Sequence, residues 1–522
     1  MSKAIMIQGT GSGVGKSIIV SGLCRIFRDM GINVAPFKAQ NMALNSFITI
    51  EGGEIGRAQA FQAEAARLEP SIDMNPILLK ASGESGCQVI LHGRVYANMR
   101  ADEYYAFREK AWKAVTDAYG RLSLNYDLIV IEGAGSPAEI NLSDDEVVNM
   151  SVARHTKAPV ILVGDIDKGG VFAALYGTIG LLGEDAGYIK AFIINKFRGD
   201  INILRPGLRM IENITNRPVL GVLPYLGDLG LHEEDGLPLE RYRQFRHFEQ
   251  VTPLKIVVLR LRYISNFTDF DPFLYEPDVD ITYSLLNRDI ENADLVIIPG
   301  SKNTVKDLLF LREQGIEESI KRAAAKGVQI IGVCGGYQML GKKILDPFGI
   351  ESDQKEVPGL NLLDIETTLE KTKVTSQVMA ELSGIEDWGL GIGGANPQTL
   401  TPKPLLKGYE IHMGKTTGDT GLFKIKRLSA SSCPSLVTHH SSLIPDGSVK
   451  GRVWGTYIHG LFDNDSFRRE LLNALRKTKG LTPHEGTIHY DGLKEMAING
   501  WAKTLRDNLD MDYLLKLIGE NR

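Results

Sequence analysis

Cysteine is scarce in this chain, and the four cysteines lie far apart in the sequence. Cys24, Cys87, Cys334 and Cys433 form no CxxC pair, so the sequence predicts neither a zinc site nor a disulfide framework. Such cysteine usage suits a reducing compartment, and we expect the protein in the cytoplasm.

Long uninterrupted apolar runs are also missing. The longest apolar region, Pro159–Gly183, is interrupted by Asp165, Asp167 and Lys168, and it falls short of a transmembrane span. Residues 3–9 run straight into a glycine loop without the basic and apolar regions of a secretory signal. We therefore expect a soluble protein with no membrane partner.

An excess of positive charge is absent as well. Lys plus Arg number 59 against 64 for Asp plus Glu, which gives a formal charge of -5 and argues against a nucleic-acid partner. What is present is an ordinary globular composition, with 43% hydrophobic and 24% charged residues. A chain of 522 residues exceeds what one core usually organises, so two or three domains are expected.

Short apolar runs alternate with helix-length amphipathic segments along most of the sequence. Examples are AIMIQG, LIVIEGAG, VILVGDID and AFIINKF in the first part, and KIVVLRL, LVIIPGS and VQIIGVCGG in the second. Continuous apolar strands separated by helices indicate parallel sheets with both faces buried. The predicted fold class is α/β.

The alternation of apolar runs and amphipathic segments is absent between Pro224 and Pro253, where charged residues, glycine and proline are frequent. We therefore predict a first domain at 1–235, a linker at 236–253, a second α/β domain at 254–468 and a helical tail at 469–522. A further irregular stretch, about 384–407, is typical of a long loop or lid within the second domain.

A glycine-rich segment, GTGSGVGKS, joins the first apolar strand to a helix. In such a loop, Gly11, Gly13 and Gly15 let backbone N–H groups face phosphates, and the helix N-terminus favours the negative charge. Lys16 would reach the β- and γ-phosphates of ATP, and Ser17 would bind magnesium. Thr10 stands where the strict spacing requires glycine, so this is a variant loop. The alternative is a plain strand-to-helix turn.

Polar side chains at later strand ends are candidates for the same site. Glu132 ends LIVIE and could hold magnesium opposite Ser17, although an acidic residue there can also be a helix cap. Asp165, in GDIDKGG, is a metal or substrate candidate. Asn195, in IINKFRGD, could contact the nucleotide, with a purely structural role as the alternative.

Cys334 lies between an apolar strand, VQIIGV, and a helix that we expect to begin at Gly336. A sharp strand-to-helix turn exposes a nucleophile, the helix N-terminus lowers the pKa of a thiol, and nearby backbone N–H groups can stabilise an oxyanion. The sequence therefore predicts a cysteine nucleophile rather than an inert buried thiol.

A thiolate nucleophile needs a base from elsewhere in the chain. His459, in VWGTYIHGLF, follows a strand and is the favoured candidate. His439 and His440 precede a polar turn and could be surface residues. His412 is a further candidate, because Glu410 and His412 would share one face of a strand.

At these motifs the sequence resembles a known family. GVCGGYQ looks like the nucleophile elbow of the class I, or triad, glutamine amidotransferases, and GYEIHMG with GTYIHGLF resembles the branch that amidates cobyrinic acid. QGTGSGVGKS followed by PFKAQNMALNS resembles the cobyric acid synthase family, whose synthetase domain is akin to dethiobiotin synthetase. The resemblance spans essentially the whole chain.

The resemblance implies glutamine-dependent amidation of the b, d, e and g carboxylates of adenosylcobyrinic acid a,c-diamide, driven by ATP and Mg²⁺, in cobalamin synthesis. Glutamine and a corrinoid would be the small-molecule partners, and a homo-oligomer is left open. The implied nucleophile is Cys334 and the implied active-site histidine is His459. Lys38 and Asn41, in the PFKAQNM motif, are substrate candidates together with Asp165, Glu410 and His412.

One departure from the family pattern concerns His459. Most class I amidotransferases carry a carboxylate two residues beyond the histidine, where this chain has Leu461. The expectation is therefore a Cys-His dyad, with the residue that orients His459 left open. The alternative functions are cobyrinic acid a,c-diamide synthase or another amidating ligase of the same architecture, and a partitioning ATPase with a similar variant loop.

Overall fold

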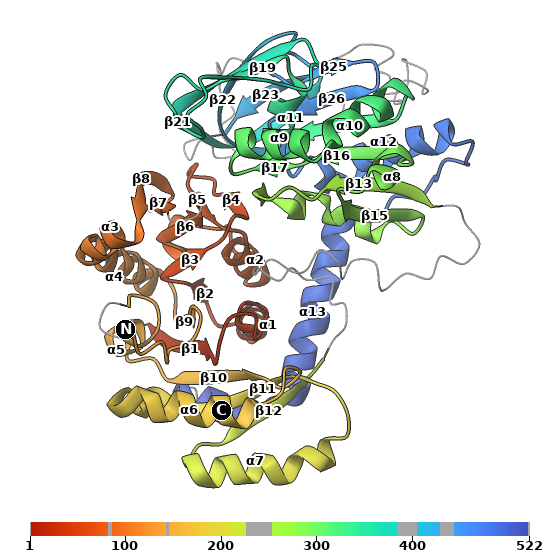
Figure 1. The fold of residues 1–522 in the computed structure, drawn as a ribbon. Coiled ribbons are helices and arrows are strands. Elements are labelled where there is room, and N and C mark those ends of the chain that lie inside the picture. Colours follow the sequence, from red (N-terminus) through yellow and green to blue (C-terminus); the bar gives the residue numbers. More distant parts are fainter. Residues whose placement is uncertain are drawn as a thin grey trace. The chain divides into compact units, whose positions relative to one another are not determined.

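The computed structural model describes residues 2–81, 86–141, 146–225, 253–383, 405–428 and 443–519 (Figure 1). The chain forms two compact units. The first consists of Met1–Ala43, Gly53–Leu237 and Gly492–Arg522, and the second of Leu44–Gly52 and Pro238–Asp491. The linker expected at 236–253 lies outside the described residues, apart from Pro253.

The first unit is built on a parallel sheet with strand order β12-β11-β10-β1-β9-β2. Its strands are β1 (Lys3–Gly9), β2 (Val34–Phe37), β9 (Leu128–Glu132), β10 (Val160–Asp165), β11 (Ile189–Phe197) and β12 (Val219–Pro224). Before the C-terminal segment, the α-helices in the described part of this unit are α1 (Lys16–Asp29), α2 (Arg57–Ala65), α3 (Ala101–Ala106), α4 (Arg108–Asn125), α5 (Met150–Thr156), α6 (Val171–Leu182) and α7 (Ile201–Thr215).

Both faces of this sheet are buried, as the continuous apolar runs predict. Ile5 and Ile7 of β1 enter a core shared with α1, whereas Met6 enters a second core shared with α4, α5 and α6. The alternation follows from the two-residue period of a strand. The predicted parallel α/β class is confirmed for this unit.

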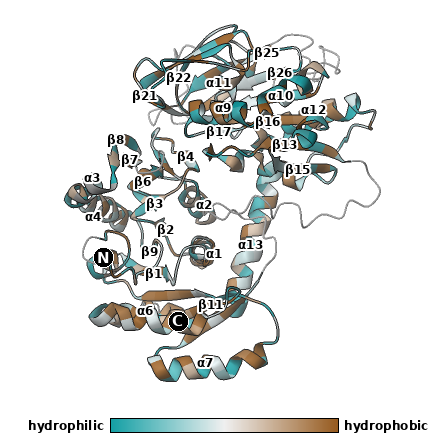
Figure 2. Cartoon of the chain, in the orientation of Figure 1, coloured by the Kyte–Doolittle hydropathy of each residue, from teal (hydrophilic) through white to brown (hydrophobic). Residues whose placement is uncertain are grey.

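A smaller mixed sheet of the first unit was not predicted. It has the order β3-β6-β7-β8, with β3 (Gln40–Met42), β6 (Ile77–Ala81), β7 (Gly86–Leu91) and β8 (Arg94–Arg100). The apolar region Pro159–Gly183 forms β10 and α6, and Figure 2 shows α6 as a largely hydrophobic helix. No helix in the described ranges has both the length and the apolar character needed to cross a membrane.

The second unit contains another parallel sheet, with order β15-β13-β16-β18-β26 and β25 added antiparallel at the edge. Its strands are β13 (Leu254–Leu259), β15 (Val279–Ser284), β16 (Leu295–Ile298), β18 (Gln329–Val333), β25 (Ser448–Lys450) and β26 (Val453–Thr456). The helices include α8 (Asn287–Glu291), α9 (Thr304–Glu313), α10 (Ile316–Ala325), α11 (Gly335–Leu340) and α12 (Asp465–Thr478).

A long antiparallel pair of strands dominates the seven-stranded sheet of the second unit. It pairs β21 (Ile365–Leu382) with β22 (Leu406–Gly418), and β22 in turn pairs with β27 (Ile458–His459). The remaining strands are β19 (Lys343–Leu345), β20 (Glu356–Pro358), β23 (Phe423–Arg427) and β24 (Ile444–Asp446). Of the loop predicted at 384–407, residues 384–404 lie outside the described ranges.

The C-terminal segment, expected as one helical tail at 469–522, is shared between the two units. Residues up to Asp491 belong to the second unit, whereas Gly492 onward belongs to the first. α13 (Tyr490–Asn508) and α14 (Met511–Leu517) carry apolar side chains, among them Trp501, Leu505 and Leu514, into the core around α1. Apolar burial against α1 explains why this part belongs with the first unit.

We expect Trp501→Ala to destabilise the first unit by about 3–5 kcal/mol, because it leaves a cavity against α1. Trp501 is 2% exposed, and its indole Nε1 donates a hydrogen bond of 2.6 Å to the Ile18 carbonyl. Trp501→Phe keeps an aromatic ring and loses that bond, so it should cost about 1 kcal/mol. Denaturant unfolding measures both, and an unchanged midpoint for Trp501→Ala would contradict this packing.

Candidate functional site

The glycine loop between β1 and α1 has a backbone that side chains would strain or block. Gly13 and Gly15 have φ of 69° and 97°, in the left-handed region that favours glycine. A Cβ at Gly15 would lie 2.3 Å from Nδ2 of Asn195, whereas one at Gly11 would meet open space. The loop therefore matches the predicted phosphate cradle in position and in backbone conformation.

Side chains at the ends of β10 and β11 hold this loop in place. Asn195 Nδ2 donates to the Val14 carbonyl at 2.9 Å, and Lys196 Nζ donates to the Gly13 carbonyl at 2.6 Å. Asp165 lies 3.2 Å from the same Lys196 ammonium. The contacts of Asn195 and Asp165 seen here thus support the loop, one directly and the other through Lys196.

Lys16 and Ser17 lie at the start of α1, as predicted. Lys16 is buried, and its Nζ donates to the Gly11 carbonyl at 2.8 Å and to the Gly135 carbonyl at 3.2 Å. Ser17 Oγ donates to Glu132 Oε1 at 2.8 Å. The structure therefore brings the predicted ligand pair, Ser17 and Glu132, into direct contact.

Glu132 is the centre of a buried polar cluster. Its carboxylate lies 2.9 Å from Lys38 Nζ and accepts a hydrogen bond of 2.5 Å from Gln62 Nε2. Burial acts to raise the pKa of Glu132, but the Lys38 charge and the hydrogen bonds from Lys38, Gln62 and Ser17 outweigh it and hold that pKa below its usual range. Glu132 is thus an anion at neutral pH.

These oxygen donors fit a magnesium ion that is shared with a nucleotide. Mg²⁺ prefers hard oxygen ligands and is usually bound by one or two protein groups together with phosphates and water. A serine hydroxyl beside a carboxylate supplies that donor set. Among the described residues there is no group of three or more His, Cys, Asp or Glu that could hold a metal ion by itself.

The substrate candidates of the PFKAQNM motif lie beside this cluster. Lys38 contacts Glu132 directly, and Asn41 Nδ2 donates to Gln59 Oε1 at 2.9 Å. Gln59 Nε2 in turn donates to Glu132 at 3.4 Å. Sequence reasoning missed Gln59 and Gln62, because two glutamines on an amphipathic helix carry no signal that separates them from solvent-exposed side chains.

In the second unit, Cys334 occupies a strained turn between β18 and α11. Its φ of 53° and ψ of -107° are unusual for a residue with a side chain, and α11 begins at Gly335, one residue earlier than expected. A Cβ at Gly336 would lie 1.9 Å from the Ile298 carbonyl oxygen. Glycine is therefore required for the close approach of this turn to β16.

His459, at the end of β27, is bound by a carboxylate that sequence reasoning did not find. Its Nδ1 lies 2.6 Å from Asp269 Oδ2, and the backbone N–H of Gly460 donates to Asp269 Oδ1 at 3.2 Å. Because Nδ1 is taken by Asp269, Nε2 is the ring nitrogen available to the thiol. The Tyr409 ring stacks on the imidazole at a centroid distance of 5.2 Å.

Burial lowers the pKa of His459, but the charge of Asp269, its hydrogen bond and the neighbouring Cys334 raise it to about 10. The imidazolium form of His459 is thus stabilised beside Cys334.

Asp269 corrects the expectation of a dyad. Leu461, which stands at the usual carboxylate position, is a buried apolar residue, whereas the carboxylate comes from the 3₁₀ helix η4 (Phe267–Tyr275). The available signal was weak. In NFTDFDPF, acidic residues alternate with aromatic residues that must be buried, and a buried acid needs a partner.

Glu410 and His412 share one face of β22, as predicted, and they bind each other. His412 Nε2 lies 3.2 Å from Glu410 Oε1, and its Nδ1 lies 2.8 Å from the Gly414 carbonyl. Arg427 Nε donates to Glu410 Oε2 at 2.6 Å. Both nitrogens of His412 are engaged, so the geometry favours His459 as the partner of Cys334. His439 and His440 lie outside the described residues.

Backbone groups of β17 (Gly300–Ser301) complete the surroundings of the thiol. A Cβ at Gly335 would lie 2.9 Å from the Ser301 nitrogen, and one at Gly300 would lie 3.3 Å from Cε1 of His459. The Cys334 Sγ lies 3.4 Å from the Ile411 carbonyl oxygen. The turn, β17 and β22 thus surround one reactive sulfur with backbone polar groups.

Both units of the chain match known protein families. Residues 5–239 match the CobQ/CobB/MinD/ParA nucleotide binding domain, and residues 255–467 match the CobB/CobQ-like glutamine amidotransferase domain. The chain is 49% identical to a cobyric acid synthase of Thermodesulfovibrio yellowstonii, covering 99% of this chain and 100% of the relative. It is 48% identical to a cobyric acid synthase of Caldanaerobacter subterraneus, covering 100% of both chains.

Proposed function

The chain belongs to the family of cobyric acid synthases, which are glutamine-dependent ligases of cobalamin synthesis, and on that premise we propose that it amidates the b, d, e and g carboxylates of adenosylcobyrinic acid a,c-diamide. The observation that carries this proposal is the Cys334–His459–Asp269 constellation in one unit of a chain whose other unit holds a phosphate loop with Lys16, Ser17 and Glu132.

Ammonia is produced in the second unit. The Cys334 thiolate attacks the side-chain carbonyl carbon of glutamine, and backbone N–H groups near the turn, such as that of Gly335, stabilise the oxyanion. His459 donates a proton to the departing nitrogen, so that ammonia leaves and a thioester remains. A water molecule, deprotonated by His459, then attacks the thioester and releases glutamate with the free thiolate.

Carboxylate activation takes place in the first unit. A substrate carboxylate oxygen attacks the γ-phosphorus of ATP, ADP departs, and an acyl phosphate forms. Ammonia displaces phosphate from this acyl phosphate and leaves an amide. Lys16 would offset negative charge on the phosphates, and Lys38, beside Glu132, would hold the carboxylate. Magnesium held by Ser17 and Glu132 would supply further positive charge at the phosphates.

We expect Asp269→Asn to lower the kcat of glutamine hydrolysis on the order of 10²–10⁴-fold, because the histidine loses the carboxylate that orients it and stabilises its imidazolium form. Since Asp269 raises the pKa of His459, its loss should also move the basic limb of the pH profile to lower pH. Activity with ammonium salts should persist. Unchanged hydrolysis in this variant would remove Asp269 from the mechanism.

The main alternative from another class is a partitioning ATPase, because the nucleotide-binding match also includes MinD and ParA. Glutamate release, measured with ATP and the corrinoid present, separates the two functions. The amidating ligase releases glutamate as ADP forms, whereas a partitioning ATPase forms ADP without consuming glutamine. A strained cysteine turn beside a histidine–carboxylate pair serves only the first activity.

A further inference from the structure

The two residues that would support Cys334 lie on or next to short 3₁₀ helices. Asp269 belongs to η4, and His459, at the end of β27, is separated by Gly460 alone from the 3₁₀ helix η5 (Leu461–Asp463). Such helices have poorer hydrogen-bond geometry than α-helices, so other parts of the fold must fix their positions. The Asp269–His459 distance thus depends on what holds η4 and η5 together.

Aromatic packing joins the middle of the two segments. The Phe462 ring of η5 lies 4.9 Å from the Phe273 ring and 6.1 Å from the Phe270 ring of η4, measured between centroids. These contacts bury apolar surface and bring the segments together. Ring packing is less directional than hydrogen bonding, so hydrogen bonds are also needed to fix the position of η4 relative to η5.

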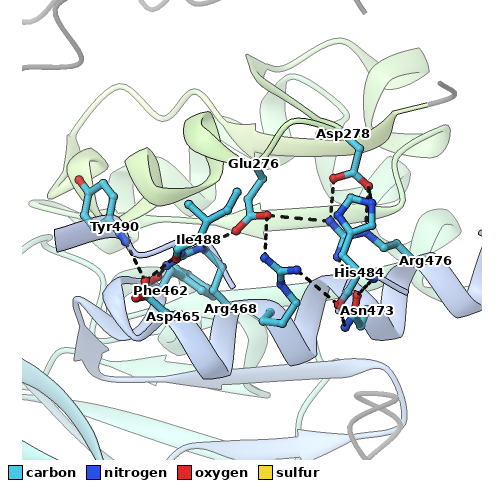
Figure 3. Close-up of polar contacts among 11 residues, drawn as sticks. Glu276, Asp278, Phe462, Asp465, Arg468, Asn473, Arg476, His484, Ile488 and Tyr490 are labelled. Carbon is cyan, nitrogen blue, oxygen red and sulfur yellow. Dashed lines mark hydrogen bonds and ion pairs between the residues drawn. The ribbon is translucent and has the colours of Figure 1, made fainter. Parts of the chain in front are cut away.

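Arg468 of α12 provides directional contacts to both segments (Figure 3). Its Nε donates to Glu276 Oε1, at the end of η4, at 3.0 Å, and its Nη1 donates to the Phe462 carbonyl at 2.8 Å. Its Nη2 donates to Asp465 Oδ1 at 2.9 Å and to the Ile488 carbonyl at 2.8 Å. Arg468 and Glu276 are each 1% exposed, so solvent does not weaken this pair.

We propose that Arg468 is a positioning residue for glutamine hydrolysis: its guanidinium binds the η4 segment through Glu276 and the η5 segment through Phe462, and thereby sets Asp269 against His459. The planar guanidinium fork is what allows one side chain to fix two segments. Arg468 acts through Asp269 and His459. This inference rests on the function proposed above.

A neighbouring arginine offers a matched control. Arg476 lies on the same helix and is 0% exposed, and it binds Asp278 at 2.6 and 2.8 Å. A further hydrogen bond goes to Asn473, and its Nη2 lies 3.9 Å from Glu276 Oε2, but within the described residues none of its hydrogen bonds reaches η5. Arg476→Lys therefore disturbs an equally buried arginine beside Glu276 but leaves in place the Arg468 guanidinium, which joins Glu276 to the Phe462 carbonyl.

The first test compares Arg468→Lys with Arg476→Lys. Lysine keeps the positive charge opposite Glu276 but loses the fork, so we expect kcat for glutamine hydrolysis to fall roughly 10- to 100-fold in Arg468→Lys. The KM for glutamine and the ammonium-supported activity should stay near the wild-type values. The basic limb of the pH profile should move to lower pH, as in Asp269→Asn, whereas Arg476→Lys should show none of these changes.

The second test is a double-mutant cycle with Asp269→Asn. If Arg468 acts through Asp269, adding Arg468→Lys to Asp269→Asn should cause little further loss of kcat. If the losses of kcat from Arg468→Lys and Asp269→Asn multiply in the double mutant, Arg468 has no positioning role through Asp269. Equal losses of kcat in Arg468→Lys and Arg476→Lys would also overturn that role and leave a purely structural one. A wild-type protein that releases no glutamate would instead refute the proposed function, so the two failures are distinguishable.

Discussion

Cys334→Ala is expected to abolish glutamine-supported amidation and to retain activity with ammonium salts. The variant lacks the sulfur that forms the thioester, so glutamine cannot release ammonia, whereas activation of the carboxylate takes place in the other unit. Because triad residues act as a unit, we expect a loss on the order of 10⁶-fold in glutamine hydrolysis. The measurement is amide formation with glutamine or with ammonium chloride as nitrogen donor.

Cys24→Ala is the matched control for this experiment. Cys24 lies in α1 and is fully buried, and burial raises the pKa of its thiol well above the usual range. It should therefore be inert, and its replacement should leave both donor activities in place. An equal loss of glutamine and ammonium activity in Cys334→Ala would contradict the division of chemistry between the two units.

Lys16→Ala is expected to lose amidation with both nitrogen donors, by at least about 10²-fold. Lys16 is the cation at the start of α1 beside the glycine loop, and without it negative charge on the transferred phosphoryl group is left unbalanced. The Cys334 site lies in the second unit, so a thioester should still form between Cys334 and glutamine.

The control for this prediction is Lys190→Ala, which removes an exposed lysine from β11 of the same unit. Lys190 binds the Gly187 carbonyl and lies outside the glycine loop, so its loss should leave amidation intact. ADP formation and amide formation are measured together. Normal ADP formation in Lys16→Ala would show that this lysine has no role in phosphoryl transfer.

Features that are contiguous in the sequence could be predicted. The glycine loop, Lys16 and Ser17 occur within one strand–turn–helix segment, and the Cys334 turn within another. In both, local residue types determine backbone conformation, because glycine permits the turn and apolar residues build the strand. The parallel sheets followed for the same reason.

Features that depend on distant pairing could not be predicted. Asp269 and His459 are 190 positions apart, and the phenylalanine spacing in η4 predicts burial without marking Asp269 as the partner of a histidine. The pairing of Lys38 with Glu132 and the burial of Trp501 against α1 have the same origin. Each depends on tertiary packing, which sequence patterns do not encode directly.

Mass spectrometry of the corrinoid product tests the proposed amidation directly. The protein is incubated with adenosylcobyrinic acid a,c-diamide, ATP and glutamine labelled with heavy nitrogen at its side-chain amide. We expect successive amide-for-acid exchanges at the b, d, e and g carboxylates, each carrying the heavy label. An unchanged corrinoid, while ATP is consumed, would contradict the proposed amidation.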